Sequence, residues 1–203
     1  MVQSRTHTCG ELRMEQVGQT VTLAGFLENV REVGQNLAFV VLRDFYGTTQ
    51  VVIETAEMMA IVKDLNKEST LQVTGVVRER DSKNPKLPTG DIEVVPSAIT
   101  VLGRCRHNEL PFPISRSREA DETQRLKYRY LDLRNPEVKN NIILRCNVVS
   151  ALRQAMTAEG FMEITTPILT ASSPEGARDY LVPSRKHPGK FYALPQAPQQ
   201  FKQ

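Results

Sequence analysis

Residues 21–28 have the sequence VTLAGFLE, and this stretch decides the fold of the first half of the chain. Val21, Leu23 and Leu27 occupy every second position, with Gly25 between them. Thr22, Ala24, Phe26 and Glu28 occupy the positions in between, a pattern typical of a β-strand with one side buried. Gly25 lies inside the run and indicates a bulge or a tight bend of the kind that small barrels need. The stretch therefore predicts a bent strand in a small barrel.

Turn signals and hydrophobic periodicity predict the other elements of this barrel. Glycine-containing turns at 34–36 and 46–48 separate the first strand from two more, and apolar residues at helical spacing follow. Three strands, a helix and two strands are the order of an OB-fold, a five-stranded barrel that binds oligonucleotides on one face. Strand patterning alone also fits other small barrels. The predicted elements are three strands within 20–54, a helix at 56–65, and strands at 71–80 and 91–102 around a Pro/Gly-rich loop at 82–90.

A long amphipathic helix dominates the second half of the chain. Asn135 can cap it, Pro136 takes the tolerated first position, and Gly160 can end it in the left-handed conformation. One face of this helix carries Ile142, Cys146, Val149, Leu152 and Met156 at three- and four-residue steps. Further strands are predicted at 161–165, 180–182 and 190–194. The sequence thus predicts an all-β barrel at 1–105, a linker at 106–135 with a helix-like stretch at 119–130, and the start of an α+β domain at 136–203.

The composition limits the classes of function. Of the 203 residues, 40% are hydrophobic and 24% are charged, as in soluble globular proteins, and no apolar run approaches the ~20 residues of a membrane span. The N-terminus has no apolar signal-peptide region. Three cysteines without a C-x-x-C pair and three scattered histidines argue against a disulfide framework or a metal site. We therefore expect reduced thiols, no metal ligands and a cytoplasmic location.

Charge is distributed unevenly between the two halves. Residues 1–105 contain 11 Lys and Arg against 13 Asp and Glu, whereas residues 106–203 contain 15 against 10. A barrel with this balance would have to bind RNA through individually placed groups and base stacking, because it has no overall positive field.

The segment from Asn135 to Leu169 carries the first specific resemblance. The amphipathic helix is followed by residues 159–169, EGFMEITTPIL, and together they resemble motif 1 of the class II aminoacyl-tRNA synthetases. In that family the helix and the following strand form much of a dimer interface, and the resemblance places Pro167 there. A buried helix followed by an edge strand would be the simpler interpretation of the helix alone.

Two later segments are similar to the bacterial-type aspartyl branch of this family. Residues 173–180, SPEGARDY, resemble its mobile amino-acid loop, and residues 191–203, FYALPQAPQQFKQ, match a strand, a proline turn and a helix start. Residues 125–134, RLKYRYLDLR, resemble its hinge. The resemblance implies an aspartate-binding set in which Lys202 would pair with the substrate carboxylate and Glu175 with its ammonium group. That set comprises Glu175, Gln199, Gln200, Phe201 and Lys202.

The same resemblance assigns anticodon recognition to the barrel. The family stacks an anticodon base on an aromatic residue of the second strand, and Phe39 matches that position. Hydrogen bonds to unstacked base edges would then read the sequence. The implied anticodon-binding residues are Arg31, Phe39, Gln50, Arg78 and Glu93. The alternatives are a core position for Phe39 and surface ion pairs for Arg31, Arg78 and Glu93.

The implied activity is that of an aspartate–tRNA ligase. The family joins aspartate to ATP with Mg²⁺ and transfers it to tRNA, and its members act as homodimers. No ATP-binding motif 2 or motif 3 follows Lys202. We therefore expect these 203 residues alone to bind neither ATP nor Mg²⁺, to contain no catalytic residue and to charge no tRNA. An asparaginyl or lysyl enzyme, or a non-catalytic RNA-binding OB protein, are the alternatives. The sequence leaves open whether asparagine-tRNA is also a substrate.

Overall fold

The computed structural model describes residues 4–172 and 179–194. The chain forms two compact units, residues 1–136 and 137–203, which are described separately. Within the described residues no helix is both long and apolar enough to cross a membrane.

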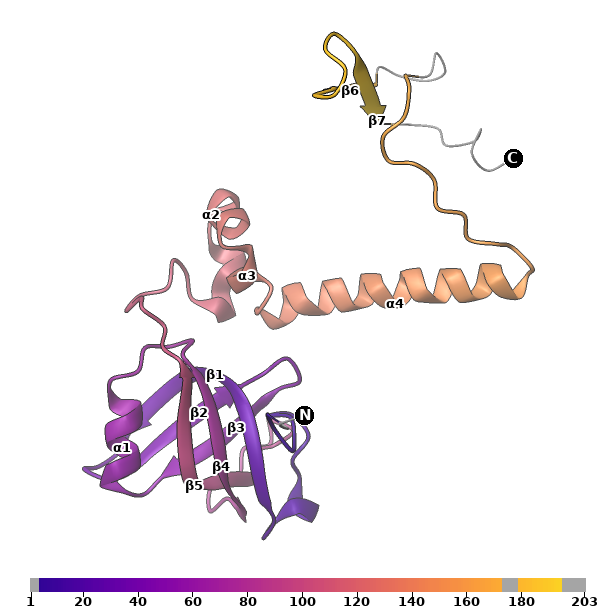
Figure 1. Ribbon diagram of the computed structural model, residues 1–203. Coiled ribbons are helices and arrows are strands. Elements are labelled where there is room, and N and C mark those ends of the chain that lie inside the picture. Colours follow the sequence, from indigo (N-terminus) through magenta and orange to yellow (C-terminus); the bar gives the residue numbers. More distant parts are fainter. Residues whose placement is uncertain (1–3, 173–178, 195–203) are drawn as a thin grey trace. The chain divides into compact units, whose positions relative to one another are not determined.

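The first unit contains a closed five-stranded barrel in which the strands follow the order β1-β2-β3-β5-β4 (Figure 1). All neighbouring strands are antiparallel except β3 and β5, which run parallel. The helix α1 (Ala56–Lys63) lies between the third and fourth strands in the sequence, as the OB-fold requires. The predicted fold class is confirmed. The strands are β1 (Thr20–Glu32), β2 (Ala38–Arg43), β3 (Thr48–Ile53), β4 (Thr70–Glu79) and β5 (Ile92–Gly103).

The bend in β1 lets one strand serve two neighbours. β1 pairs with β4 up to Phe26 and with β2 from Phe26 onward. Gly25 lies at this crossing, where a Cβ atom would be only 2.6 Å from the carbonyl oxygen of Arg43. The register with β2 shifts between Leu27 and Asn29, so the bulge itself falls three residues after the glycine. The glycine therefore allows β1 to approach the backbone of Arg43 closely, and the bulge increases the local bend and twist of β1.

Inward-facing residues of all five strands fill the barrel. In β1 the buried residues are Val21, Leu23 and Leu27, as the sequence periodicity predicts. Met59 and Val62 of α1 join this core, and so do Cys9 and Leu12 of the N-terminal segment. Burial raises the pKa of the Cys9 thiol to about 12, with a further contribution from the charge of Asp44. This thiol is accordingly a packing group of the core.

The segment between the barrel and residue 136 folds into short helices. They are the 3-10 helix η2 (Ile114–Glu119), α2 (Glu122–Lys127) and α3 (Arg129–Asp132). The single helix-like stretch predicted at 119–130 is divided at Tyr128, whose ψ of 43° leaves the helical region. The side-chain amide of Asn135 donates to the carbonyls of Ile114 (2.9 Å) and Ser115 (3.2 Å). Both ends of this segment are therefore tied together.

The second unit begins with a 23-residue helix, α4 (Pro136–Ala158). Gly160 follows it with a φ of +85°, the left-handed conformation that the sequence predicts for the helix end. β6 (Tyr180–Pro183) and β7 (Phe191–Leu194) form a two-stranded antiparallel ribbon. The strand predicted at 161–165 is wrong. A strand needs a hydrogen-bonded neighbour, and the described residues pair with this part of the chain only at Thr170, which bridges to Ala193.

Candidate nucleic-acid interface

Each barrel strand contributes one predicted anticodon residue to a single hollow of about 290 Å³. The five positions are far apart in the sequence, and only the closed strand order brings them together. The structure therefore assembles the whole predicted set on one side of the barrel. The set consists of Arg31 on β1, Phe39 on β2, Gln50 on β3, Arg78 on β4 and Glu93 on β5.

Phe39 presents its ring to the outside of the barrel. It alternates with Ala38 and Val40, whose side chains are buried in the core, and is itself half-buried. The alternative of a core phenylalanine is therefore wrong. Arg31 pairs with Phe39 across the β1–β2 ladder, and its guanidinium carbon lies 5.0 Å from the ring centroid, a cation–π geometry. Arg31 thus holds the ring on one side, and the rest of the ring faces the hollow.

Glu93 is the buried centre of a hydrogen-bonded network. Its side chain, only 6% exposed, accepts from Arg78 on one oxygen and from Gln50 on the other. Arg78 Nε and Nη2 are 3.1 and 2.7 Å from Glu93 Oε1, and Gln50 Nε2 is 3.0 Å from Oε2. A carboxylate offers about four lone-pair positions. These three bonds therefore leave one position, on Oε2, for an outside donor.

Arg78 joins two carboxylates at the rim of the hollow. Besides Glu93, its Nη2 donates to Glu54 Oε1 at 2.8 Å. These hydrogen bonds, first to Glu54 and then to Glu93, raise the pKa of Arg78 above its ordinary value. The ion pairs considered for Arg78 and Glu93 are thus present. They also fix the guanidinium beside the hollow, so structural pairing and an RNA contact are compatible.

Arg80 and Glu54 belong to the same network and were not among the predicted residues. Arg80 Nη2 donates to Gln50 Oε1 at 2.9 Å, so the Gln50 amide is used on both sides. The available signal was the period of two in the strand predicted at 71–80, which puts Arg80 on the face of Arg78. No comparable signal identifies Glu54, since its role depends on the pairing of β3 with the other strands.

The predicted aspartate-binding residues lie outside the described residues. This applies to Glu175, Gln199, Gln200, Phe201 and Lys202, whose assignment stays a prediction. Among residues 4–172 and 179–194 no three His, Cys, Asp or Glu side chains are grouped so that they could hold a metal ion.

Pro167 and the preceding helix present an apolar surface in the second unit. Pro167 is exposed, and so are all five residues of the predicted apolar face of α4. Residues 161–164 extend this surface, and Met162 is 83% exposed. A hollow of about 520 Å³ lies between them. Its apolar lining residues are Val149, Leu152, Met156, Phe161, Met162 and Ile164.

Two protein-family models match successive parts of the chain. A model described as "OB-fold nucleic acid binding domain" matches residues 21–102. A model described as "tRNA synthetases class II (D, K and N)" matches residues 121–203. The first match covers the barrel with its candidate interface, and the second covers α4 and all the predicted aspartate-binding residues.

Solved structures show the same fold. The asparaginyl-tRNA synthetase of Pyrococcus horikoshii, in a structure with asparaginyl-adenylate, aligns with a TM-score of 0.82 and 26% identity over 99% of this chain and 44% of its own. A putative aspartyl-tRNA synthetase of Leishmania major aligns with a TM-score of 0.86 over all of this chain and 41% of its own. Its identity of 24% supports the fold only.

Curated relatives are similar over nearly the whole sequence. The aspartate–tRNA(Asp/Asn) ligase of Gluconobacter oxydans is 52% identical over 98% of the chain, and the aspartate–tRNA ligase of Streptomyces avermitilis is 54% identical over 98%. The chain spans about a third of the length of these relatives, 33% and 34% respectively. From these relatives and the two family models, the chain belongs to the aspartate–tRNA ligase family of class II synthetases, with an OB-fold nucleic-acid-binding domain followed by the opening part of the class II domain.

Proposed function

We propose that the barrel binds the anticodon loop of a tRNA at the hollow formed by its five strands. The observation that supports this proposal is the convergence of Arg31, Phe39, Gln50, Arg78 and Glu93 on one hollow. An aromatic ring, two guanidinium groups, an amide and a carboxylate are the groups that recognise unstacked RNA bases. The barrel has no excess of positive charge, which suits recognition by stacking and hydrogen bonds.

The proposed recognition has two parts. One base stacks on the half-buried ring of Phe39, where the contribution does not depend on net charge. A second base donates a hydrogen bond to the remaining acceptor position of Glu93, which Arg78 and Gln50 hold in place. Because those partners already fix the carboxylate, binding costs little side-chain entropy. The site is therefore prepared before RNA arrives.

The substitution Phe39→Ala tests this proposal. It should weaken binding of an aspartate-tRNA anticodon stem-loop by about 1–3 kcal/mol, the range for one base–aromatic stack. The barrel should stay folded, because the ring lies outside the core. Fluorescence anisotropy at fixed salt would measure the dissociation constant.

Phe45→Ala is the matched control. Phe45 is also aromatic and is 58% exposed, but it follows β2 and does not line the hollow. An unchanged dissociation constant for Phe39→Ala, with an unchanged circular dichroism spectrum, would contradict the proposal. Equal losses for both variants would show that any surface aromatic ring contributes.

For a longer protein that contains this chain, we propose the activity of its relatives, aspartate–tRNA ligase. Glu175, Gln199, Gln200, Phe201 and Lys202 would bind L-aspartate, and ATP with Mg²⁺ would supply the activation chemistry. The described residues provide no metal-binding cluster, so we assign no Mg²⁺ position to them. One of the two relatives is named an aspartate–tRNA(Asp/Asn) ligase and the other an aspartate–tRNA ligase, so asparagine-tRNA is a candidate substrate beside aspartate-tRNA. A cytoplasmic location is part of this proposal.

We further propose that the apolar face of α4 with residues 161–164 and Pro167 is a homodimer interface. Leu152 and Met156 lie exposed on a 23-residue helix, and exposed apolar patches of this kind mark interaction sites. A second copy would also offer a hydrogen-bonding neighbour to the extended segment at 161–167. The resemblance to motif 1 supports the same partner.

A further inference from the structure

The turn between α1 and β4 contains the one non-glycine residue with positive φ among the described residues, Glu68 at +67°. Its amide donates to the carbonyl of Leu27 at 2.8 Å, and the Leu27 amide donates to Ser69 at 2.8 Å. The left-handed conformation is strained for residues other than glycine. A glycine would relieve this strain, which directs attention to the contacts that the side chain of Glu68 makes.

The Glu68 carboxylate joins the barrel to the segment between β5 and α4, residues 104–135, which is called the hinge from here on. Its side chain is only 6% exposed, and its two oxygens accept one hydrogen bond each, from Arg43 of β2 and from Arg134 at the end of the hinge. The ring of Phe26 lies beside both guanidinium groups, whose carbons are 5.8 and 4.0 Å from its centroid. A buried carboxylate with two cations over one aromatic ring has a defined geometry that exposed ion pairs lack.

The same turn also holds the start of the hinge. Asn66 Nδ2 donates to the carbonyl of Cys105 at 2.9 Å and to Asn108 Oδ1 at 3.1 Å. The hydroxyl of Ser69 accepts from the Cys105 amide at 3.0 Å. Residues 66–69 therefore bind both ends of a segment about thirty residues long, which returns to its starting point.

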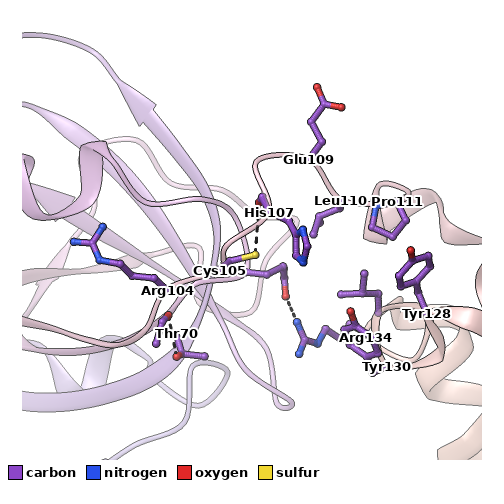
Figure 2. Close-up of a pocket in the computed structure, with 13 residues that line it drawn as sticks. Thr70, Arg104, Cys105, His107, Glu109, Leu110, Pro111, Tyr128, Tyr130 and Arg134 are labelled. Atoms are coloured by element: carbon purple, nitrogen blue, oxygen red, sulfur yellow. Dashed lines mark hydrogen bonds and ion pairs between the residues drawn. The ribbon is translucent and has the colours of Figure 1, made fainter.

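The space between these attachments is a hollow of about 600 Å³ (Figure 2). Arg134, His107, Tyr128 and Tyr130 are among its lining residues, and Figure 2 marks the ion pair of Arg134 with a dashed line. Its lining comes from Glu68, Thr70 and Gly103 and from the two ends of the hinge, within 104–111 and 128–134.

We infer that residues 66–69 act as a clamp that makes the hinge a rigid extension of the barrel, with Glu68 as its positioning residue. The segment predicted from sequence as a linker is then a rigid part of the first unit. Fixing its end at Arg134 fixes the direction in which the chain leaves the barrel. The clamp itself does not depend on what the barrel binds. Any effect of the clamp on how a bound tRNA is held relative to the rest of the protein rests on the proposed function.

Hydrogen exchange of the chain, followed by mass spectrometry, tests the clamp. Glu68→Gln should accelerate exchange in hinge peptides covering 104–115 and 129–135 by on the order of tenfold, while peptides of the barrel core exchange as before. Glu68→Gly should do the same, and because glycine suits the left-handed conformation it removes the carboxylate without straining the turn. Glu79→Gln is the control, since Glu79 pairs with Lys83 on the exposed surface of β4.

Arg134→Gln supplies a second measurement. If Arg134 acts through Glu68, the Arg134→Gln/Glu68→Gln double variant should exchange no faster in the hinge than the faster single variant. Hinge exchange unchanged in both Glu68 variants would overturn the inference. So would equal acceleration in hinge and barrel, because that would make Glu68 a general stability residue.

Binding of the anticodon stem-loop separates this inference from the proposed function. The clamp lies outside the candidate interface, so Glu68→Gln should leave the stem-loop dissociation constant unchanged within about twofold. A wild-type chain that binds no stem-loop would contradict the proposed function, while the exchange result would still decide the clamp. A loss of stem-loop binding in Glu68→Gln would overturn the view that the clamp acts only on the hinge.

Discussion

Asp132 is a buried carboxylate in the hinge that is surrounded by donors. Ser117 Oγ lies 2.7 Å from it, Arg125 Nε lies 3.2 Å away, and Arg129 forms an ion pair with the second oxygen. Burial acts to raise the pKa of Asp132, but the hydrogen bonds from Arg125 and Ser117 and the charges of Arg125 and Arg129 outweigh it, so the pKa is lowered. The folded hinge therefore prefers the charged carboxylate.

The substitution Asp132→Asn should destabilise the first unit at neutral pH by about 1–3 kcal/mol, because charge-assisted hydrogen bonds are lost. The folded pKa is depressed, so the stabilisation is complete above the unfolded pKa of about 3.9 and is lost as pH falls through the folded value. Urea unfolding at pH 7 and near pH 3 would measure this. The wild-type advantage should shrink at the lower pH.

Asp121→Asn is a suitable comparison, since Asp121 caps α2 at the surface through the Thr123 amide. A difference between wild type and Asp132→Asn that stays constant down to pH 3 would show that packing, and not charge, accounts for the role of Asp132.

At the residue scale, the sequence identifies the groups that face the hollow but not their partners. Phe39 and Gln50 follow from strand alternation together with the family resemblance. The bond from Arg80 to Gln50 and the pair of Arg78 with Glu54 depend on the register between strands distant in sequence. Such register comes from packing of the closed barrel, which no local pattern contains.

At the scale of elements, α4 combines a long helix with an uncovered apolar face. The rise of 1.5 Å per residue makes it about 35 Å long. This length is comparable to the diameter of a whole small domain. The helix bounds follow from the sequence because the capping signals are local. The covering of its face does not, since the pattern is the same for an internal core and for an interface.

Leu152→Arg tests the proposed homodimer. Leu152 is 60% exposed, so an arginine there should disrupt a dimer without unfolding the chain. Light scattering after size-exclusion chromatography, at concentrations of tens of micromolar, would give the mass. We expect a dimer for the wild type and a monomer for the variant.

Asn147→Arg on the same helix is the control, because Asn147 is an exposed polar residue outside the apolar hollow. A wild-type chain that is monomeric throughout this range, or a Leu152→Arg chain that still dimerises, would argue against this interface.

Among the elements, the strands of the barrel are predictable and the segment 161–165 is not. Barrel strands alternate because each has a buried and an exposed face within the same unit. The residues 161–165 have strand-like composition, but their exposed Phe161, Met162 and Ile164 find no cover among the described residues. Composition can show that a segment is suited to pairing without showing where its partner is.

At the scale of the whole molecule, the division after residue 136 makes a direct prediction. A chain of residues 1–136 should fold cooperatively and bind the anticodon stem-loop with a dissociation constant within about twofold of that of the 203-residue chain. All residues of the candidate interface and of the clamp are contained in it.

Urea unfolding and anisotropy would measure both properties. A chain of residues 1–105, which ends before Arg134, should fold less stably because the Glu68 carboxylate loses one of its two partners. Equal stability of the two shortened chains would contradict the assignment of the hinge to the first unit.

The alternation of the barrel strands has a consequence for how recognition can change over evolutionary time. Phe39 lies between Ala38 and Val40, so neighbouring positions belong in turn to the interior and to the outward surface that carries the proposed interface. A mutation at an outward position leaves the interior intact, and descendants can acquire a new nucleotide preference through single steps that are all viable. The alternation thus separates changes in binding preference from changes in the folded scaffold.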